Sequence, residues 1–169
     1  KIQFIETGYI AEDVRLEYIK RGKVRDRFKP SLYKVGYLGD YNVETEIDKK
    51  LRDTWRKMIE RCYDESHRQY KDYGGNGVFV DTSWHNMSTF ITDAKTLINW
   101  DEKSKNWNDY SLDKDYYASN CYSKDTCVWL TIGDNALYSK SKPFKSIDKC
   151  GNEMIWISQV DCAKHFNIK

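Results

Sequence analysis

The stretch SLDKDYYASNCYSKDTCVWLT, Ser111 to Thr131, together with Tyr110 before it, contains two short runs of strand-forming residues separated by a polar loop. The first run is Tyr110 to Lys114 and the second is Val128 to Thr131. Gly133 to Asn135 then provides a helix start before ALYSK. The sequence therefore predicts strand, loop, strand and helix in that order.

This order puts a carboxylate, Asp113, on the first strand and an amide, Asn135, on the helix. Oxygen ligands of these two kinds can share one hard cation such as Mg²⁺. A structural interpretation stands beside this one. In it Asp113 is a turn residue, Tyr122 and Trp129 are core residues and Asn135 is a helix cap, and the residues taken alone favour it.

On the N-terminal side, residues 46 to 64 predict a helix. Apolar residues recur at the i, i+4, i+7, i+8, i+11 spacing of one helix face, at Leu51, Trp55, Met58, Ile59 and Cys62. The stretch YKDYGGNGVFVDTSW then breaks the helix, with positive-φ positions expected at Gly74-Gly75 and Asn76-Gly77 and a short strand at residues 78–80. We expect a second helix from Trp84 to Leu97 and a connecting loop from Asn99 to Tyr110.

Residues 1 to 40 predict a small antiparallel sheet. Three runs of β-branched and aromatic residues, IQFIETGYI, DVRLEYI and GKVRDRF, are separated by the turn signals Thr7-Gly8, Arg21-Gly22, Lys29-Pro30 and Leu38-Gly39. Residues 15–34 also contain eight basic residues against two acidic ones, although the net charge of the whole chain is only +2. A local basic patch attracts phosphate backbones. The candidate DNA contacts are Arg15, Lys20, Arg21, Lys23 and Arg25, and a solvated charged face is an equally good interpretation of the charge alone.

Composition sets limits on the class of protein. The chain has 169 residues, of which 40% are hydrophobic and 15% aromatic, enough for one moderate core or two small ones. No apolar run approaches the ~20 residues of a membrane span, and the start KIQFIETGYI does not resemble a signal peptide. We therefore expect a cytoplasmic protein with no membrane contact. Five cysteines at irregular spacing predict reduced thiols instead of disulfides or structural zinc.

Two parts of the chain resemble phage-encoded HNH endonucleases. The first is WRKMIERCY, residues 55–63, followed by YKDYGGNGVFVDTSW and Phe90 to Asp93, which resembles the module W..M..RCY…Y..YGG.G..V...W…F..D of many small phage proteins. The second is SLDKDYYASNCYSKDTCVWLT, which is similar to LDRID..G.YSPENCRWAT. Together the two motifs cover roughly half of the chain, and their paired order is more specific than either alone.

The resemblance implies roles for individual residues. Asp113 and Asn135 match the metal ligands, with Mg²⁺ or Mn²⁺ as the cofactor and double-stranded DNA as the substrate. The histidine base of the family is missing, and Lys114 stands in its place; a lysine with its ordinary pKa of ~10.4 is a poor base at neutral pH but can contact phosphate. In variant members that lack this histidine, a loop tyrosine lies near the scissile phosphate, and Tyr122 matches it as base or water-positioning group. Thr126 replaces the asparagine of the family, which implies a less firmly pinned loop.

The C-terminal segment KPFKSIDKCGNEMIWISQVDCAKHFNIK predicts strand, a turn at residues 150–152, strand, and a helix with Ser158 as N-cap. It resembles the DNA-binding repeats at the ends of phage homing endonucleases. In those repeats a recognition helix comes next, so we expect that the chain either is a fragment or has lost that element. A plain amphipathic terminus is the alternative.

The sequence thus predicts an α+β protein in three segments. They are a basic β-rich segment at residues 1–42, an HNH-like ββα-metal nuclease domain at 43–140 and a segment like a DNA-binding repeat at 141–169. The expected function is a metal-dependent DNA endonuclease or nickase. Because the histidine is missing, two alternatives stay open: a non-catalytic DNA-binding or regulatory protein on the same scaffold, and a protein-interaction module such as an inhibitor. The oligomeric state is not predicted.

Overall fold

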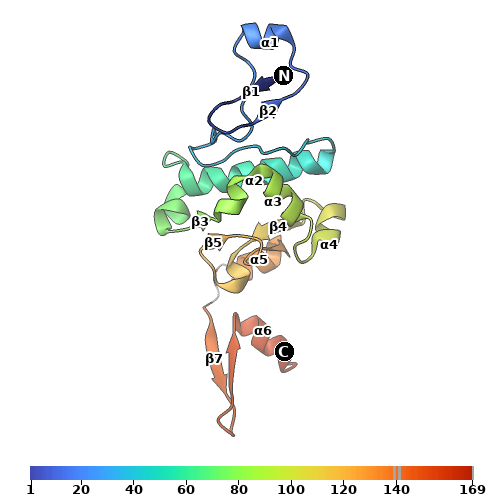
Figure 1. Cartoon of the computed structure of the whole chain (residues 1–169). Helices are drawn as coiled ribbons and strands as arrows, with labels where there is room; N and C mark the ends of the chain where they lie inside the picture. The colour runs from blue at the N-terminus through green and yellow to red at the C-terminus, as the bar shows by residue number, and fades with distance from the viewer. Residues whose placement is uncertain (139, 141, 169) are drawn as a thin grey trace. The chain divides into compact units, whose positions relative to one another are not determined.

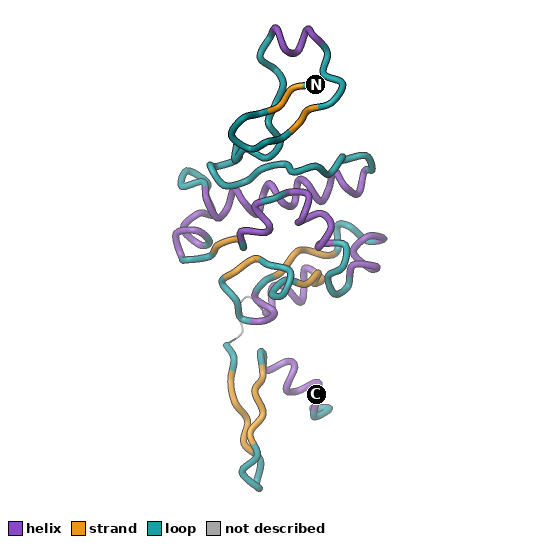
Figure 2. Tube along the Cα trace, viewed as in Figure 1, coloured by secondary structure: helices purple, strands orange, loops and turns teal. Residues whose placement is uncertain are grey.

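The computed structural model describes residues 1–138, 140 and 142–168 and has a mixed α+β architecture (Figure 1). The strands form small two-stranded sheets, and short helices and loops make up most of the remaining chain (Figure 2). The chain divides into two compact units: Lys1–Asn76 with Val80–Thr92, and Gly77–Phe79 with Asp93–Lys169. The three segments predicted above are a functional division that these units do not test, and they stay a prediction.

The first unit begins with a small antiparallel sheet, as predicted. Strands β1 (Ile2–Gln3) and β2 (Ile10–Ala11) pair so that Ile2 lies opposite Ala11. The expected strand in DVRLEYI is wrong, because Leu16–Lys20 forms helix α1. The expected strand in GKVRDRF is also wrong, since residues 22–28 form turns and loop. An ion pair of 3.0 Å between Glu17 and Arg21, four residues apart, supports this helical turn. None of the five helical residues is buried. The apolar residues of this segment therefore do not pack against a core as the alternate residues of a strand would.

Helix α2 (Glu46–Tyr63) confirms the predicted helix at residues 46–64. Its first turn is fixed by a capping box, in which the Asp48 N–H donates to Thr45 Oγ1 and the Thr45 N–H donates to Asp48 Oδ2. All five residues of the predicted apolar face are buried: Leu51, Trp55, Met58, Ile59 and Cys62. Trp55 is anchored further by its indole N–H, which donates to the Trp84 carbonyl oxygen at 2.7 Å.

The glycine-rich stretch after α2 is more helical than expected. It forms the 3₁₀ turns η1 (Tyr70–Asp72) and η2 (Gly74–Asn76) before strand β3 (Phe79–Val80). Among these glycines only Gly77 has a positive φ, of +79°. Gly74 is required for a different reason, since a Cβ atom there would lie 2.1 Å from the Cys62 carbonyl oxygen. The expectation of a positive-φ turn at Gly74-Gly75 is therefore wrong.

The helix predicted from Trp84 to Leu97 is also shorter and divided. Residues Thr82–His85 form a 3₁₀ turn, η3, and Met87–Ala94 form helix α3. The Asn86 side chain causes the division, because its Oδ1 accepts from the Ser88 N–H at 2.9 Å and starts a new helix. Trp84 still reaches the core, with its ring centroid 5.0 Å from that of Phe90.

The second unit contains a helix where a loop was predicted. Helix α4 (Trp100–Lys105) occupies half of the stretch from Asn99 to Tyr110. Lys103 explains the difference, because it is buried and its ammonium donates to the carbonyl oxygens of Trp107 and Tyr110, each at 2.6 Å. The same ammonium lies 3.8 Å from the Trp107 ring centroid, a cation–π contact that burial strengthens.

The central motif of the second unit has the predicted order. Strands β4 (Tyr110–Asp113) and β6 (Val128–Thr131) are antiparallel, with Asp113 opposite Val128, and helix α5 (Ile132–Tyr138) follows at once. The loop between the strands contains the turn η4 (Asp115–Tyr117) and strand β5 (Cys121–Tyr122), which pairs with β3. Trp129 is completely buried and its indole N–H donates to the Ala94 carbonyl oxygen at 2.9 Å.

The C-terminal strand, turn, strand and helix are confirmed. Strands β7 (Phe144–Ile147) and β8 (Glu153–Trp156) form an antiparallel hairpin, and helix α6 (Gln159–His165) follows (Figure 1). Ser158 caps this helix as predicted, its Oγ accepting from the Asp161 N–H at 3.1 Å. The Tyr138 hydroxyl at the end of α5 donates to Asp161 Oδ1 at 2.6 Å, which links the two helices.

Two further expectations concern the whole chain. All five cysteines are free thiols, as predicted. Over residues 1–138, 140 and 142–168, the structure contains no helix with the length and apolar character that crossing a membrane requires.

Candidate functional site

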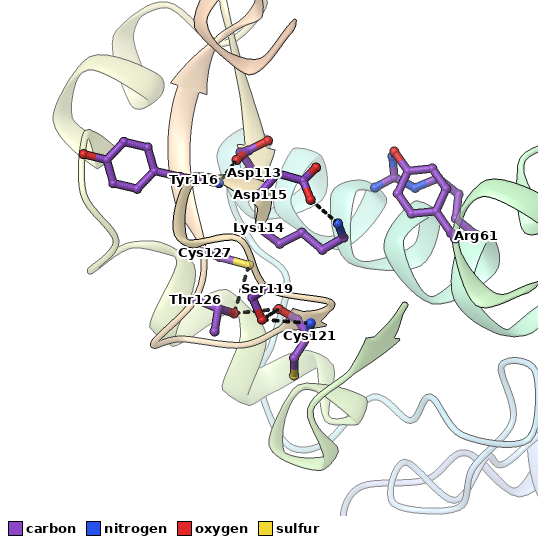
Figure 3. A network of polar contacts seen from close by, with 10 residues as sticks. Arg61, Asp113, Lys114, Asp115, Tyr116, Ser119, Cys121, Thr126 and Cys127 are labelled. Atoms are coloured by element: carbon purple, nitrogen blue, oxygen red, sulfur yellow. Dashed lines mark hydrogen bonds and ion pairs between the residues drawn. The ribbon is translucent and has the colours of Figure 1, made fainter. Parts of the chain in front are cut away.

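Asp113 is the last residue of β4 and is buried, with only 3% of its surface exposed. Its Oδ1 accepts a hydrogen bond of 2.7 Å from the Tyr116 N–H, which closes the turn into η4 (Figure 3). Burial raises the pKa of this carboxyl above its ordinary value, whereas the hydrogen bond from the Tyr116 N–H opposes the rise. A carboxyl held in this way is costly to ionise, a property common at functional sites.

Asn135 lies on α5, and its side chain contacts the strand that carries Asp113. The Asn135 Nδ2 donates to Ser111 Oγ at 2.6 Å. Ser111 and Asp113 are two residues apart on β4, so their side chains leave the same face of the strand. The hydrogen bond fixes the amide against this face, and among the described residues its carbonyl oxygen accepts no hydrogen bond. The structure thus brings the helix-borne amide and the strand-borne carboxylate to one face of β4.

Lys114 and Tyr122 also lie close to each other. The Lys114 ammonium is 5.8 Å from the centroid of the Tyr122 ring, and only 6% of Lys114 and 3% of Tyr122 are exposed. The same ammonium forms an ion pair with Oδ1 of Asp115, a residue that we did not select from the sequence (Figure 3). The signal for it is the sequence Asp-Lys-Asp itself, in which a second carboxylate follows the lysine at once.

The side chains near Asp113 limit which metal ion could bind there. Within the described part of the chain, no three His, Cys, Asp or Glu side chains converge as a metal site. One carboxylate and one amide oxygen, from Asp113 and Asn135, are nevertheless a suitable protein contribution to Mg²⁺, which usually keeps several waters and uses substrate phosphates as further ligands. The residues therefore fit a cation that binds together with its substrate, and they do not form a closed structural cage.

Thr126 holds the loop after β5 by several hydrogen bonds. Its Oγ1 donates to the Cys121 carbonyl oxygen at 2.6 Å and accepts from the Ser123 N–H at 3.1 Å. On the other side of the loop, Ser119 Oγ accepts from the Cys121 N–H at 3.0 Å (Figure 3). Thr126 therefore does pin this loop, because its hydroxyl both donates and accepts at this position, and its strength relative to the asparagine of the family stays a prediction.

Thr126→Val is expected to lower the free energy of unfolding by about 1–3 kcal/mol, because it removes the hydroxyl from partly buried partners while keeping the shape of the side chain. Thr126→Ser keeps the hydroxyl and is the matched control, with a smaller loss. Urea unfolding of the two variants measures the difference. Equal stabilities would show that the methyl group, and not the hydrogen bonds, holds this loop.

Cys127 lies beside Thr126, with its Sγ 4.0 Å from Thr126 Oγ1. Burial raises the pKa of this thiol to about 12. The thiol is therefore protonated at neutral pH, and a protonated thiol is neither a strong nucleophile nor a metal ligand. Its place near Asp113 does not add a ligand to the candidate site.

In the first unit, the five predicted DNA contacts are all exposed: Arg15, Lys20, Arg21, Lys23 and Arg25. Arg21 pairs with Glu17 on the surface, and exposed pairs of this kind are weak. Tyr18, which we did not select from the sequence, is 44% exposed and lines two small hollows, of about 440 and 400 Å³, together with Arg15, Lys23 and Arg25. An exposed aromatic ring among basic side chains is typical of surfaces on which nucleic-acid bases stack.

Comparisons with protein-family models, curated proteins and solved structures give no match to this chain. The two units therefore have to be interpreted from their own residues. The candidate site consists of Asp113 and Asn135 on the β4 face, with Lys114, which follows Asp113 in the chain and lies close to Tyr122. The exposed basic segment is a surface feature of the first unit.

Proposed function

We propose that the protein is a DNA-binding, HNH-type ββα-metal endonuclease or nickase. The observation that supports this most is the hydrogen bond between Asn135 on α5 and Ser111 on β4, two residues before Asp113. It brings the two ligand types that the resemblance requires to one strand face. The resemblance of the two sequence motifs and the local excess of basic residues are further support.

Each candidate residue would have a separate role in phosphodiester hydrolysis. When bound, Mg²⁺ or Mn²⁺ would neutralise charge on the scissile phosphate and favour ionisation of water. Asp113 and Asn135 would hold the cation, and the Asp113 carboxyl must be ionised to do so. Because burial raises the pKa of Asp113, cation affinity is expected to fall as the pH decreases toward that raised value. The Lys114 ammonium would stabilise developing negative charge, and the Tyr122 hydroxyl would position the attacking water or accept its proton.

A second candidate function is a non-catalytic DNA-binding protein on the same scaffold. Two observations favour it: Lys114 is already paired with Asp115, and Tyr122 is almost fully buried. In that case Asp113 serves to close the turn into η4 through the Tyr116 N–H. The nuclease proposal requires the Lys114–Asp115 pair to open when a phosphate binds, whereas the second candidate does not.

Incubation with supercoiled plasmid separates the two functions. A nickase converts the plasmid to the open circle, and an endonuclease also gives linear DNA, in Mg²⁺ or Mn²⁺ but not with a chelator. The nuclease proposal predicts one of these products. Intact plasmid in both metals, together with salt-dependent binding to the same DNA, would leave the binding protein as the function.

The basic segment is expected to contribute the non-specific part of DNA binding. Replacing Arg15, Lys20 and Lys23 together by alanine should weaken binding to all duplex sequences alike. It should also reduce the slope of log affinity against log salt by about 0.9 for each phosphate that the variant no longer neutralises. Replacing Lys57, Arg68 and Lys71, also exposed in the first unit, changes the charge equally and is the control. The same salt slope for both triple variants would show that residues 15–23 make no special contribution to DNA binding.

A further inference from the structure

The first unit contains a cavity of about 630 Å³ in which Arg25 is the only lining residue that has a role in the proposed function. It lies between the loop at residues 25–38 and one face of α2, and every lining residue falls between Arg25 and Arg56. Four of its lining residues are apolar, Pro30, Leu32, Leu38 and Trp55, and together they are called the floor below. A cavity of this size with an apolar floor and a few polar groups is typical of a small-molecule site.

The rim of the cavity is cationic. Four basic side chains line it, Arg25, Lys29, Arg52 and Arg56, against two acidic ones, Asp26 and Asp53. The acidic groups have partners of their own: Asp26 accepts from the Thr7 hydroxyl at 2.6 Å and from the Phe28 N–H at 3.0 Å, and Asp53 lies 3.6 Å from Arg52. Four cations against two carboxylates leave an excess of positive charge in the lining.

Two of the four cations are free for a ligand. Lys29 is paired with Glu6 at 2.6 Å, and Arg52 has the nearby Asp53 carboxylate. In contrast, Arg25 and Arg56 form no ion pair or side-chain hydrogen bond within the described residues. A guanidinium binds phosphate through two parallel N–H groups, so two such groups beside an apolar floor favour a phosphate attached to a flat apolar body.

We propose that this cavity binds a nucleotide, with the base on the apolar floor and the phosphate against Arg25 and Arg56. The nucleotide can come from two sources, a free mononucleotide or an unpaired or terminal nucleotide of DNA, and both present the same chemistry. The proposal goes beyond nuclease action and does not depend on it, because no residue of the Asp113 site lines the cavity. Arg25 lines both this cavity and the hollow beside Tyr18.

Isothermal titration calorimetry of the full chain with deoxyadenosine monophosphate tests the proposal. We expect one site per chain, with Arg25→Ala and Arg56→Ala each weakening binding at least about tenfold, which corresponds to about 1.4 kcal/mol. Arg56→Lys keeps the charge but loses the paired N–H geometry, so its nucleotide affinity should lie between those of the original protein and Arg56→Ala. Lys57→Ala is the matched control, because Lys57 is an exposed cation on the same helix that does not line the cavity.

Three further probes define the ligand. Deoxyadenosine and inorganic phosphate should each bind more weakly than the nucleotide, and equal binding of either one would overturn the proposal because only one half of the cavity would then be used. A 5′-phosphorylated oligonucleotide that binds more tightly than the free nucleotide identifies a DNA end as the source, and the reverse order identifies the free nucleotide. No binding of the nucleotide, or an equal loss in Lys57→Ala, would also overturn the proposal.

The variant Asp113→Asn keeps this result separate from the nuclease proposal. It removes the carboxylate of the ββα motif and leaves every residue of the cavity unchanged. Nucleotide affinity should therefore be the same in Asp113→Asn as in the original protein, whatever the outcome of the plasmid experiment. Circular dichroism of the arginine variants checks that they fold, as expected for exposed side chains.

Discussion

Replacing Asp113 by asparagine is expected to lower metal-dependent DNA nicking by roughly 10²- to 10³-fold or more, because the amide cannot supply the anionic ligand that a hard cation prefers. The measurement is the rate of conversion of supercoiled plasmid to the open circle in Mg²⁺ and in Mn²⁺. DNA affinity should change little, because the exposed basic side chains at residues 15–25 are proposed to supply most of the attraction to phosphate. An unchanged nicking rate would show that Asp113 only closes the turn into η4.

The same variant is expected to be at least as stable as the original protein at neutral pH. Burial raises the pKa of Asp113 in the folded protein, so the ionised carboxylate destabilises the fold above that raised pKa, whereas below its ordinary value of 3.8 it is protonated in both states. The gain in stability from asparagine should therefore increase as the pH rises from about 4 through the raised pKa of Asp113, and then become constant. Urea unfolding over this range gives the comparison, and a loss of stability that grows with pH would contradict it.

Trp55→Ala is expected to lower the free energy of unfolding by about 3–5 kcal/mol. The side chain is 3% exposed on the buried face of α2, and its indole N–H is bonded to the Trp84 carbonyl oxygen. The fit is close, since a Cβ atom on Gly36 would lie only 3.0 Å from Trp55 Cζ2. With a total stability of about 5–15 kcal/mol for an ordinary domain, this loss would unfold a measurable fraction of the protein.

Trp55→Phe separates the two contributions. Phenylalanine keeps much of the apolar volume but leaves the Trp84 carbonyl without its donor, so it should cost about 1–3 kcal/mol. Chemical denaturation followed by circular dichroism measures both variants. A mild loss of stability in Trp55→Ala together with a large loss of DNA binding would place the tryptophan in an interface and not in the core.

The elements that the sequence predicts well are those whose pattern repeats. The apolar positions from Leu51 to Cys62 recur with the period of a helix over several turns, and each of them is buried in α2. The two strands around the loop at residues 114–127 and the Ser158 cap are also predicted from residues that are close together in the sequence. Local patterns of this type need no knowledge of distant residues.

The elements that the sequence does not predict depend on contacts between distant residues. Helix α4 looks like a polar loop because its main anchor is a lysine, and Lys103 becomes a core residue only when the carbonyl groups of Trp107 and Tyr110 surround it. The contact between Asn135 and Ser111 joins residues 24 apart in the chain. A spacing rule can nominate Asn135 as a ligand but cannot show that it reaches the strand of Asp113.

The central claim is that Asp113 and Asn135 hold one hard cation, and direct measurement of Mn²⁺ binding tests it without relying on activity. Calorimetric titration with Mn²⁺, in the presence of a short DNA duplex to supply phosphate oxygens, should give one site per chain. Asp113→Asn should abolish this site and Asn135→Ala should weaken it, whereas Asp125→Asn, an exposed aspartate of the same loop, should leave it unchanged. Mn²⁺ binding that is absent in the original protein, or that survives Asp113→Asn undiminished, would contradict the account.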